Sequence, residues 1–519
     1  MAFTAFAKFA ALIATIGNAI AKCDILHGVP PKTLGKWAAN RACLFVSSLF
    51  FAWGFIYGLL DVMNSHVREA LGLSASKGSI LAVAYVSPPS LSMLLKNYAN
   101  IRLQYMAYIW GPLFGSGPLV KRFGYRPAFL LGLTLIAGGS FLFSFAAQTK
   151  NFWLLAAGMH LSGLGVSTLE RAANPYVVNV GPIVSRTTRI LFAQSMAGVG
   201  TVVAPLVAKV MLYDSNTTSV ATPEAVSDLG KTISLYRYVG FITIGVVVLF
   251  AMLFYRTTWV SEILVESSPV TEHGWRLWKH PILSMQYARL WTGVFSNFFN
   301  MACQVTIAQF FIDSLVGPGH QTMAVATLYL SIAQVLFVLG RMVSFGLVAQ
   351  PWLKIRPRWV LLGYISAAVV VSAICIGVSG KVLIAFACLA MFWEAPSFPM
   401  NFEAATVGLG PWAATAETMM IISISGGSMG PPLAGFIKDS SDVAKTWILV
   451  AAFFGVVWIF PMLCNLIPSW RNAVDLEEEN TSDVEIQLNV MGKKNVDSSE
   501  DQASEEEQEQ MEGEKREQK

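Results

Sequence analysis

Long apolar stretches recur along this chain, separated by short polar segments, and each is near the length that crosses a lipid bilayer. An α-helix needs about 20 consecutive, mostly apolar residues to span the hydrocarbon core. We therefore predict an all-α membrane protein that crosses the bilayer many times.

The composition agrees with that prediction. The chain has 519 residues, of which 54% are hydrophobic and 13% charged, and its mean hydropathy is +0.54. A soluble protein of this length would carry about a quarter charged residues. The six cysteines show neither metal nor redox spacing, and most lie in apolar stretches, which favours packing roles.

Charge is distributed unevenly along the chain. Residues 472–519 hold 16 acidic and 5 basic residues, so the remainder holds 31 basic and 16 acidic ones. A polar segment that is poor in aromatic residues cannot bury enough apolar surface to fold alone. We predict an acidic, disordered cytoplasmic tail at 468–519, and a cytoplasmic or interfacial N-terminal segment at 1–42.

Twelve predicted spans follow from the apolar stretches. They lie at about 43–63, 78–120, 127–148, 152–175, 188–212, 235–255, 290–314, 323–349, 358–378, 381–401, 412–437 and 444–467. The longest polar connection, 256–289, divides them six and six. This predicts an N-terminal bundle at 43–255, a cytoplasmic linker at 256–289 and a C-terminal bundle at 290–467, the plan of the major facilitator fold.

The second span is anomalous, because it is too long for one crossing and too interrupted for two. Removing residues 86–104 joins two apolar pieces into a single stretch of ordinary length. We hypothesise that 86–104 is an insertion foreign to the fold, such as a retained intron. The alternative is a genuine extramembrane loop that splits a broken helix.

Basic residues predict the orientation, since Lys and Arg gather in cytoplasmic loops. They cluster before span 1 and in the loops after spans 2, 4, 6 and 8. Both termini are then cytoplasmic. The loop after span 5 holds the sequon Asn216-Thr217-Thr218, a possible glycosylation site on the outer face. We expect the plasma membrane as the location.

Glu170 lies near the end of a long apolar stretch that begins at Phe152, within the sequence Leu-Glu-Arg-Ala-Ala-Asn-Pro. Ionisable groups at membrane depth are costly, and they mark transport pathways, proton relays or ion pairs. Glu170 is therefore the first candidate for a transport mechanism. An internal ion pair is the structural alternative.

The chain resembles the L-fucose:proton symporter family of the major facilitator superfamily, over roughly residues 44–467. The motifs that carry the resemblance are Trp53-Gly54-Phe55 with Leu60-Asp61, Ala84-Tyr85 joined to Tyr105-Met106-Ala107-Tyr108, Leu169-Glu170-Arg171-Ala172-Ala173-Asn174-Pro175 with Gly181-Pro182, Phe192-Ala193-Gln194-Ser195, Gln304-Val305, Phe310-Phe311-Ile312, Gly340-Arg341, Phe398-Pro399, and Gly426-Gly427 with Gly430-Pro431. The second half is the looser match.

Several positions depart from the family pattern. Arg171 replaces the usual threonine beside the glutamate, and Ala197 stands where a sugar-binding asparagine would fall. Asp313 and Lys121 also differ from what relatives often carry. The identity of the sugar is therefore open.

The resemblance implies Asp61 as proton carrier and Glu170 as both proton-coupled and sugar-facing. A carboxylate in a low-dielectric cavity suits this task, because desolvation disfavours its charged form. Each acid could instead serve as an internal ion pair or a helix cap.

Sugar recognition needs amides and acids aimed at hydroxyl groups. Asn174 lies one helical turn after Glu170, Gln194 is the span-5 candidate, and Asn300 and Gln304 lie one turn apart in span 7. Such amides also form interhelical hydrogen bonds in bundles, so a structural role is open for each.

The function we predict is proton-coupled symport of a monosaccharide (L-fucose-like, galactose or glucose) by alternating access. The alternatives are a transporter-like nutrient sensor that signals through the tail, or a uniporter or exporter of another small solute. We expect a sugar, protons and the lipid bilayer as partners, no nucleic acid, no metal, no cofactor beyond the proton, and a monomer. An enzyme is not indicated, since the chain shows no nucleophile–base arrangement and no phosphate loop.

Overall fold

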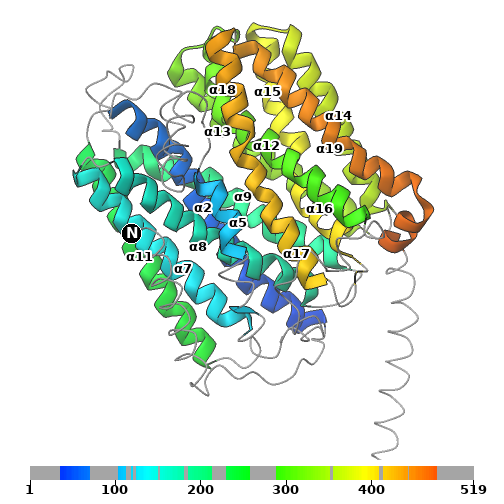
Figure 1. The fold of residues 1–519 in the computed structure, drawn as a ribbon, viewed down its shortest axis with the longest axis horizontal. Helices are drawn as coiled ribbons and strands as arrows, with labels where there is room; N and C mark the ends of the chain where they lie inside the picture. The colour runs from blue at the N-terminus through cyan, green and yellow to red at the C-terminus, as the bar shows by residue number, and fades with distance from the viewer. Residues whose placement is uncertain are drawn as a thin grey trace, which may run out of the picture.

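A computed structural model gives the fold (Figure 1). It describes residues 36–70, 103–112, 119–120, 124–149, 152–180, 185–212, 229–256, 288–350, 353, 355–407, 409, 413–441 and 443–475. The descriptions that follow concern those residues.

The described residues are helical and contain no strand, which confirms the all-α prediction. The helices of the first half are α2 (Lys36–Ala70), α5 (Leu103–Trp110), α7 (Tyr125–Thr149), α8 (Phe152–Asn179), α9 (Arg186–Leu212) and α11 (Leu229–Arg256). Those of the second half are α12 (Ala288–Val316), α13 (Met323–Ala349), α14 (Pro357–Gly377), α15 (Gly380–Glu394), α16 (Ser397–Thr406), α17 (Ala413–Ile422), η10 (Ser423–Ser428), α18 (Gly430–Ser440), η11 (Val443–Lys445) and α19 (Thr446–Leu466). Eight helical segments in the described part are long and apolar enough to cross a membrane.

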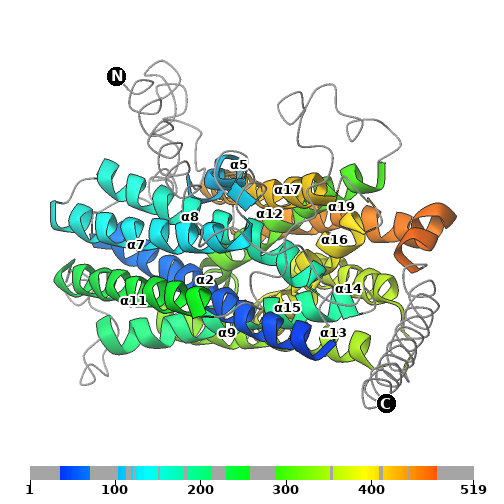
Figure 2. The same ribbon diagram turned by 90° about the horizontal axis from the view of Figure 1, so that it is seen from below.

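The helices form two groups that lie side by side (Figures 1 and 2). In the first group α7 packs along α8 and α11, and α2 packs along α9. In the second group α14 packs along α19, and α12 contacts α19, η10 and α16. The first helix of each half thus packs against one of the last helices of the same half, α2 against α9 and α12 against α19.

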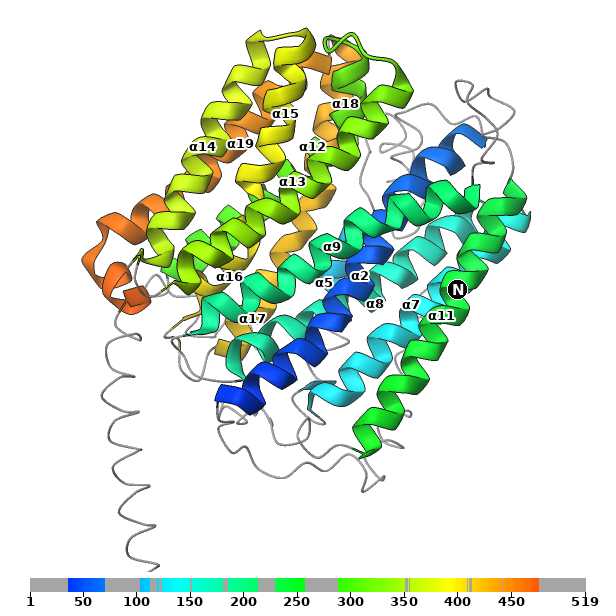
Figure 3. The same cartoon turned by 180° about the vertical axis from the view of Figure 1, so that it is seen from behind.

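The two groups meet along α9 and α13, which run next to each other at the centre of Figure 3. Gly198 of α9 faces Val338 of α13, and the rings of Phe192 and Phe345 lie 6.2 Å apart. Further contacts join α5 to η10 and α8 to α17. This boundary carries most of the polar chemistry described below.

The anomalous second span is only partly described. Residues 71–102 lie outside the described part, and with them most of the proposed insertion at 86–104. Its last two residues, Leu103 and Gln104, form the first residues of α5. The insertion hypothesis stays a prediction.

Two predicted spans are interrupted helices. The span at 381–401 is α15 and α16, which are separated at Ala395 and Pro396. A proline has no N–H to donate and so interrupts the helical ladder. The span at 412–437 is α17, the 3-10 segment η10 and α18, with Gly426 and Gly427 inside η10.

Pro461 lies inside α19 and has the same effect without ending the helix. Its ring removes the N–H that would bond to the carbonyl of Val457, four residues earlier. Ser296 of α12 donates to that carbonyl from Oγ at 3.1 Å. The proline thus frees an acceptor that links two helices.

Arginines near helix starts satisfy the C-terminal carbonyls of neighbouring helices. Arg189 of α9 donates to the carbonyls of Val177 and Val178 at 2.8 and 2.7 Å, and Arg289 of α12 donates to Val407 beyond α16. The last carbonyls of a helix have no intrahelical donor, and a cation there is favourable. Both arginines lie at the ends that the sequence assigns to the cytoplasm.

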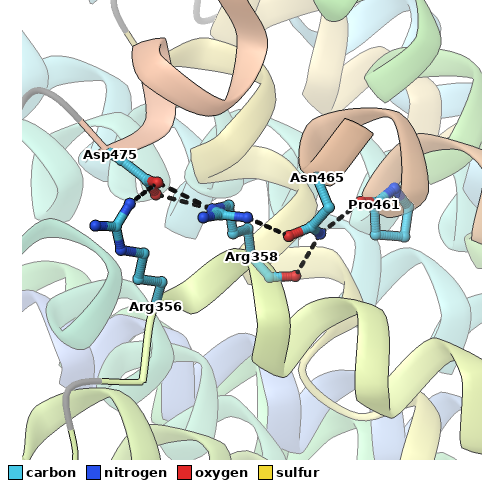
Figure 4. Close-up of polar contacts among 5 residues, drawn as sticks. All are labelled: Arg356, Arg358, Pro461, Asn465 and Asp475. Carbon is cyan, nitrogen blue, oxygen red and sulfur yellow. Dashed lines mark hydrogen bonds and ion pairs between the residues drawn. The ribbon is translucent and has the colours of Figure 1, made fainter. Parts of the chain in front are cut away.

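The helical body continues past the predicted start of the tail, because residues 468–475 are also helical. Asp475 forms ion pairs with Arg356 and, at 3.0 Å, with Nε of Arg358 (Figure 4). Arg356 directly precedes α14, and Arg358 lies in its first turn. Arg358 also donates to Asn465 Oδ1 at 2.5 Å. This cluster fastens the end of the described chain to the bundle.

Candidate functional site

Glu170 lies in the interior of α8, where its side chain is 6% exposed. The hydroxyl of Tyr108, on α5, donates to Glu170 Oε1 at 2.8 Å, and Tyr57 of α2 is hydrogen-bonded to the same hydroxyl. Three helices therefore converge on one carboxylate. Hydrogen bonding of this kind offsets part of the cost of burying a polar group.

Two amides continue the network from Glu170. Asn174 donates from Nδ2 to the backbone carbonyl of Glu170 at 3.1 Å, and its Oδ1 accepts from Gln194 Nε2 at 2.9 Å. Asn174 and Gln194 are both buried. The structure thus brings together three residues that the sequence singled out, and it fixes the orientation of both amides.

Arg341 of α13 joins this group from the second half. It donates from Nη1 to the carbonyl of Gln194 at 2.5 Å and from Nε to the carbonyl of Ala395 at 2.9 Å. Its guanidinium carbon lies 4.4 Å from the centroid of the Phe337 ring. A buried arginine is thereby anchored to both halves.

Sequence reasoning gave Arg341 no role beyond its place in a Gly-Arg motif. The signal that could have found it is an arginine inside an apolar span, since such a residue needs an anionic or carbonyl partner. Gly340 explains its position, because a Cβ at that residue would overlap the carbonyl oxygen of Phe392. The glycine lets α13 approach α15 closely.

Arg341 lies within electrostatic range of two carboxylates, Glu170 and Glu394. Glu394 is the last residue of α15 and is 3% exposed. Neither of its carboxylate oxygens has a hydrogen-bond partner among the described residues. The helix is interrupted directly after it, at Ala395 and Pro396.

The two candidates on α12 are less closely connected. Asn300 is buried and its Oδ1 has no hydrogen-bond partner in the described part of the chain, whereas Gln304 is half-buried. No hydrogen bond described for either side chain links it to Glu170. Their predicted place in the substrate site stays a prediction.

Two further candidate side chains lie outside the described part of the structure. Asp61 lies within α2, and its side chain is outside the described part. Asn216 lies in the segment 213–228, which is also outside it. The predicted roles of both residues stay predictions.

A second polar cluster crosses the boundary between the halves. Arg171 of α8 donates from Nε to Thr418 Oγ1 at 2.7 Å and lies within electrostatic range of Glu417. Asn179 donates to Glu417 Oε1 at 3.0 Å. Two residues of α8 therefore reach α17, where Asn179 bonds the Glu417 carboxylate and Arg171 bonds the neighbouring Thr418.

No group of histidines, cysteines or acids that could hold a metal ion occurs among the described residues. The five cysteines that are described are buried and free of disulfides. The site consists instead of acids, amides, tyrosines and one arginine. Such groups bind protons and hydrogen-bond to hydroxyls.

Comparison with known proteins gives a consistent result. The family model for the Major Facilitator Superfamily matches residues 46–416. The L-fucose-proton symporter of Escherichia coli (strain K12) is 24% identical over 423 residues, which cover 80% of this chain and 90% of that protein. A glucose/galactose transporter of Brucella abortus biovar 1 (strain 9-941) is 23% identical over 415 residues, covering 79% and 92%.

Solved structures show the same fold. The crystal structure of the transporter FucP in the outward conformation has a TM-score of 0.61 and 21% identity, and covers 82% of this chain and 99% of that one. A single-residue variant of the E. coli fucose:proton symporter FucP gives the same values. The predicted fold class is confirmed.

Proposed function

Since the chain belongs to the Major Facilitator Superfamily, we propose that it couples the movement of a monosaccharide to that of a proton by alternating access of its two halves. Its similarity to an L-fucose-proton symporter and to glucose/galactose transporters supports the sugar as substrate and the proton as coupling ion. Family and fold are those of transporters and not of enzymes, in agreement with the sequence.

One observation carries the proposal: a buried carboxylate, that of Glu170, lies next to a pair of hydrogen-bonded amides inside the bundle. The acid can take up and release a proton, because burial disfavours its charged form and makes protonation responsive to the surroundings. Asn174 and Gln194 can exchange their mutual hydrogen bond for bonds to sugar hydroxyls. The proton and the sugar would then bind to neighbouring side chains, as coupled transport requires.

The remaining candidates complete the proposed cycle. Asp61 carries the proton in company with Glu170, and Asn300 and Gln304 contact the sugar from the second half. Alternating access then consists of the two halves moving about the site between them. The link from Arg341 to the carbonyls of Gln194 and Ala395 connects the halves where that movement occurs.

The proposed membrane arrangement follows from charge. Lys and Arg near the helix ends support an orientation with both termini in the cytoplasm and Asn216 outside. The plasma membrane is the location that we propose. The contacts of Arg171 and Asn179 with α17 then lie toward the cytoplasmic side. They hold the halves together on that side, and a monomer suffices for the cycle.

Uptake of radiolabelled sugar into proteoliposomes tests the proposal. L-fucose, galactose and glucose are each offered to the wild type and to Glu170→Gln, with an inward proton gradient. We expect one sugar to accumulate in the wild type and accumulation to disappear in Glu170→Gln. Glu403→Gln is a matched control, since Glu403 is a buried acid on α16 outside the Glu170 network.

Other outcomes favour other functions. Flux that does not respond to the proton gradient in either protein indicates a uniporter or an exporter. Binding of sugar without flux, with signalling that is lost on truncation of the tail after residue 475, indicates a sensor. Movement of none of the three sugars excludes monosaccharide symport of this kind.

A further inference from the structure

Glu394 differs from the other acids of the interior in having a carboxylate without hydrogen-bond partners among the described residues. A buried polar group without a partner is destabilising, and an ionised one far more so. Native proteins retain such groups at sites of function or where water or a ligand supplies the partner. Its neighbour Pro396 ends the regular helix there, so the carboxylate lies at a helix break and not within a continuous ladder.

Arg341 is the cation that interacts electrostatically with both Glu394 and Glu170. Its guanidinium bonds the carbonyl of Ala395, the residue after Glu394, and lies within electrostatic range of both acids. It also bonds the carbonyl of Gln194, which belongs to the Glu170 network. One fixed positive charge therefore serves two buried carboxylates, one from each half.

Arg341, Glu170 and Glu394, called the trio below, bind a proton in a way that depends on their net charge. With both acids ionised, the three groups carry a net charge of −1 inside the protein, where an unbalanced charge is strongly disfavoured. One added proton makes the trio neutral. Because the acids share a counter-ion, the proton belongs to the pair and not to one residue.

Among the described residues, the other titratable groups around the two acids do not supply a second cation. Cys303 of α12 is within electrostatic range of Glu394, and Tyr108 with Tyr57 lies against Glu170. Tyr364 of α14 donates to the carbonyl of Gly340, beside Arg341. Thiols and phenols stay neutral under ordinary conditions.

We infer that Glu394 is a further proton-binding carboxylate of the transport cycle, beside Glu170 and Asp61, and that it shares Arg341 with Glu170. The inference rests on the proposed symport. When the proton is on Glu394, Arg341 balances the ionised Glu170; when the proton is on Glu170, Arg341 balances Glu394. The proton enters from one side of the membrane and leaves to the other, and only O–H bonds form and break.

This sharing couples protonation to the contact between the halves. Glu170 lies on α8 of the first half and Glu394 on α15 of the second. Arg341 is hydrogen-bonded to the carbonyl of Gln194 in the first half and to that of Ala395 in the second, and lies within electrostatic range of both acids. Movement of the proton changes which half holds the guanidinium more strongly. The side-chain amide of Gln194 bonds Asn174, and its backbone carbonyl accepts from the same guanidinium. Sugar binding at Gln194 would therefore also affect how strongly each half holds Arg341.

Two measurements on Glu394→Gln test the inference, with Glu403→Gln as the control. The first is accumulation of the transported sugar along a proton gradient, and the second is sugar exchange at equal concentrations without a gradient, at pH 5.5 to 8.5 (roughly the range around neutrality in which such acids are tuned). We expect accumulation to fall at least about tenfold in Glu394→Gln while exchange persists and loses most of its dependence on pH. Glu403→Gln should keep both properties of the wild type.

The outcomes separate this inference from the proposed function. If the wild type accumulates sugar and Glu394→Gln does so with an unchanged pH profile, the inference is wrong and symport stands. If the wild type does not accumulate sugar, the proposed function is wrong, and the inference that rests on it is wrong as well.

A second variant covers the case in which Glu394→Gln does not fold. Glu394→Asp keeps a carboxyl group but draws it back from Arg341. We expect it to retain accumulation with a displaced pH profile of exchange. A profile that superimposes on that of the wild type would overturn the inference.

Discussion

Arg171 and Thr418 join the two halves of the molecule through a hydrogen bond of 2.7 Å from the guanidinium Nε to the hydroxyl Oγ1. The arginine follows Glu170 directly in sequence, yet it contacts α17 and lies within electrostatic range of Glu417. Adjacent residues on a helix point about 100° apart, which lets one serve the interior site and the other the boundary. The departure from the family's threonine thus provides a charged contact between the halves.

The first prediction concerns this contact. Arg171→Thr removes the hydrogen bond to Thr418 and one of the two cations, with Arg186, that lie within electrostatic range of the buried Glu417. Removing a partner from buried polar groups costs about 1–3 kcal/mol. We expect a clear fall in the thermal unfolding midpoint of the purified protein in detergent. Glu417→Gln should show a similar fall, because it leaves the guanidinium uncompensated.

The double variant decides whether the two residues act together. Arg171→Thr combined with Glu417→Gln removes both charges, so the loss should be smaller than the sum of the single losses. Strict additivity of the unfolding midpoints would show that the two side chains contribute independently.

The second prediction concerns the amides beside Glu170. Asn174→Ala removes the acceptor for Gln194 and one proposed contact to sugar hydroxyls. We expect the half-saturating sugar concentration to rise about tenfold, equivalent to about 1.4 kcal/mol. The measurement is the concentration dependence of uptake in proteoliposomes, at saturating proton gradient.

Gln321→Ala is the matched control, because that amide donates to the carbonyl of Gly319 in a turn between helices. It should leave the half-saturating concentration unchanged. An Asn174→Ala protein that matches the wild type would remove the amide from the proposed sugar site.

The helices were largely predictable because each one is an apolar stretch of membrane-crossing length. The span predicted at 323–349 coincides with α13. The interruptions after Glu394 and at η10 were less visible, because each lies inside a stretch whose total length suits a single membrane crossing. Proline and glycine mark both places, but Pro461 shows that a proline can also lie within an unbroken helix.

The site was predictable only within single helices. Glu170 and Asn174 share a helix, so their spacing alone places them on one face. Tyr108 bonds Glu170 from α5, and Arg341 of α13 lies within electrostatic range of it. Periodicity does not say which helices are neighbours. The single cation that Glu394 shares with Glu170 depends on the packing of α13 between α9 and α15, which the sequence pattern does not give.

The third prediction tests how α13 is placed. Gly340→Ala puts a methyl group against the carbonyl oxygen of Phe392 and the Cβ of Ala395. The helices must separate, which displaces Arg341 from Ala395. We expect lower thermal stability, because overpacking typically costs about 1–3 kcal/mol, together with a lower rate of uptake.

Gly346→Ala on the same helix is the control, since nothing lies within 4 Å of a Cβ at that position. It should be neutral or slightly stabilising, because alanine favours a helix more than glycine does. Equal effects of the two substitutions would indicate that helix propensity, and not the approach to α15, determines the result.

The fourth prediction concerns the end of the helical body. Asp475 accepts from Arg356 and Arg358, and Trp470 and Val474 of the same helical segment pack against the core. We expect Asp475→Asn to loosen residues 468–475 and so to speed tryptic cleavage after Arg471. The measurement is limited proteolysis followed by mass spectrometry.

The two arginines should not contribute equally. Arg356 is 51% exposed, and exposed ion pairs contribute little, whereas Arg358 is 7% exposed and also holds Asn465. Arg358→Gln should therefore speed cleavage more than Arg356→Gln does. High salt should reduce the difference in cleavage rate between wild type and Asp475→Asn, because it screens the exposed ion pair of Arg356 with Asp475. Cleavage at the wild-type rate in Asp475→Asn would show that the apolar contacts of Trp470 and Val474 hold the segment by themselves.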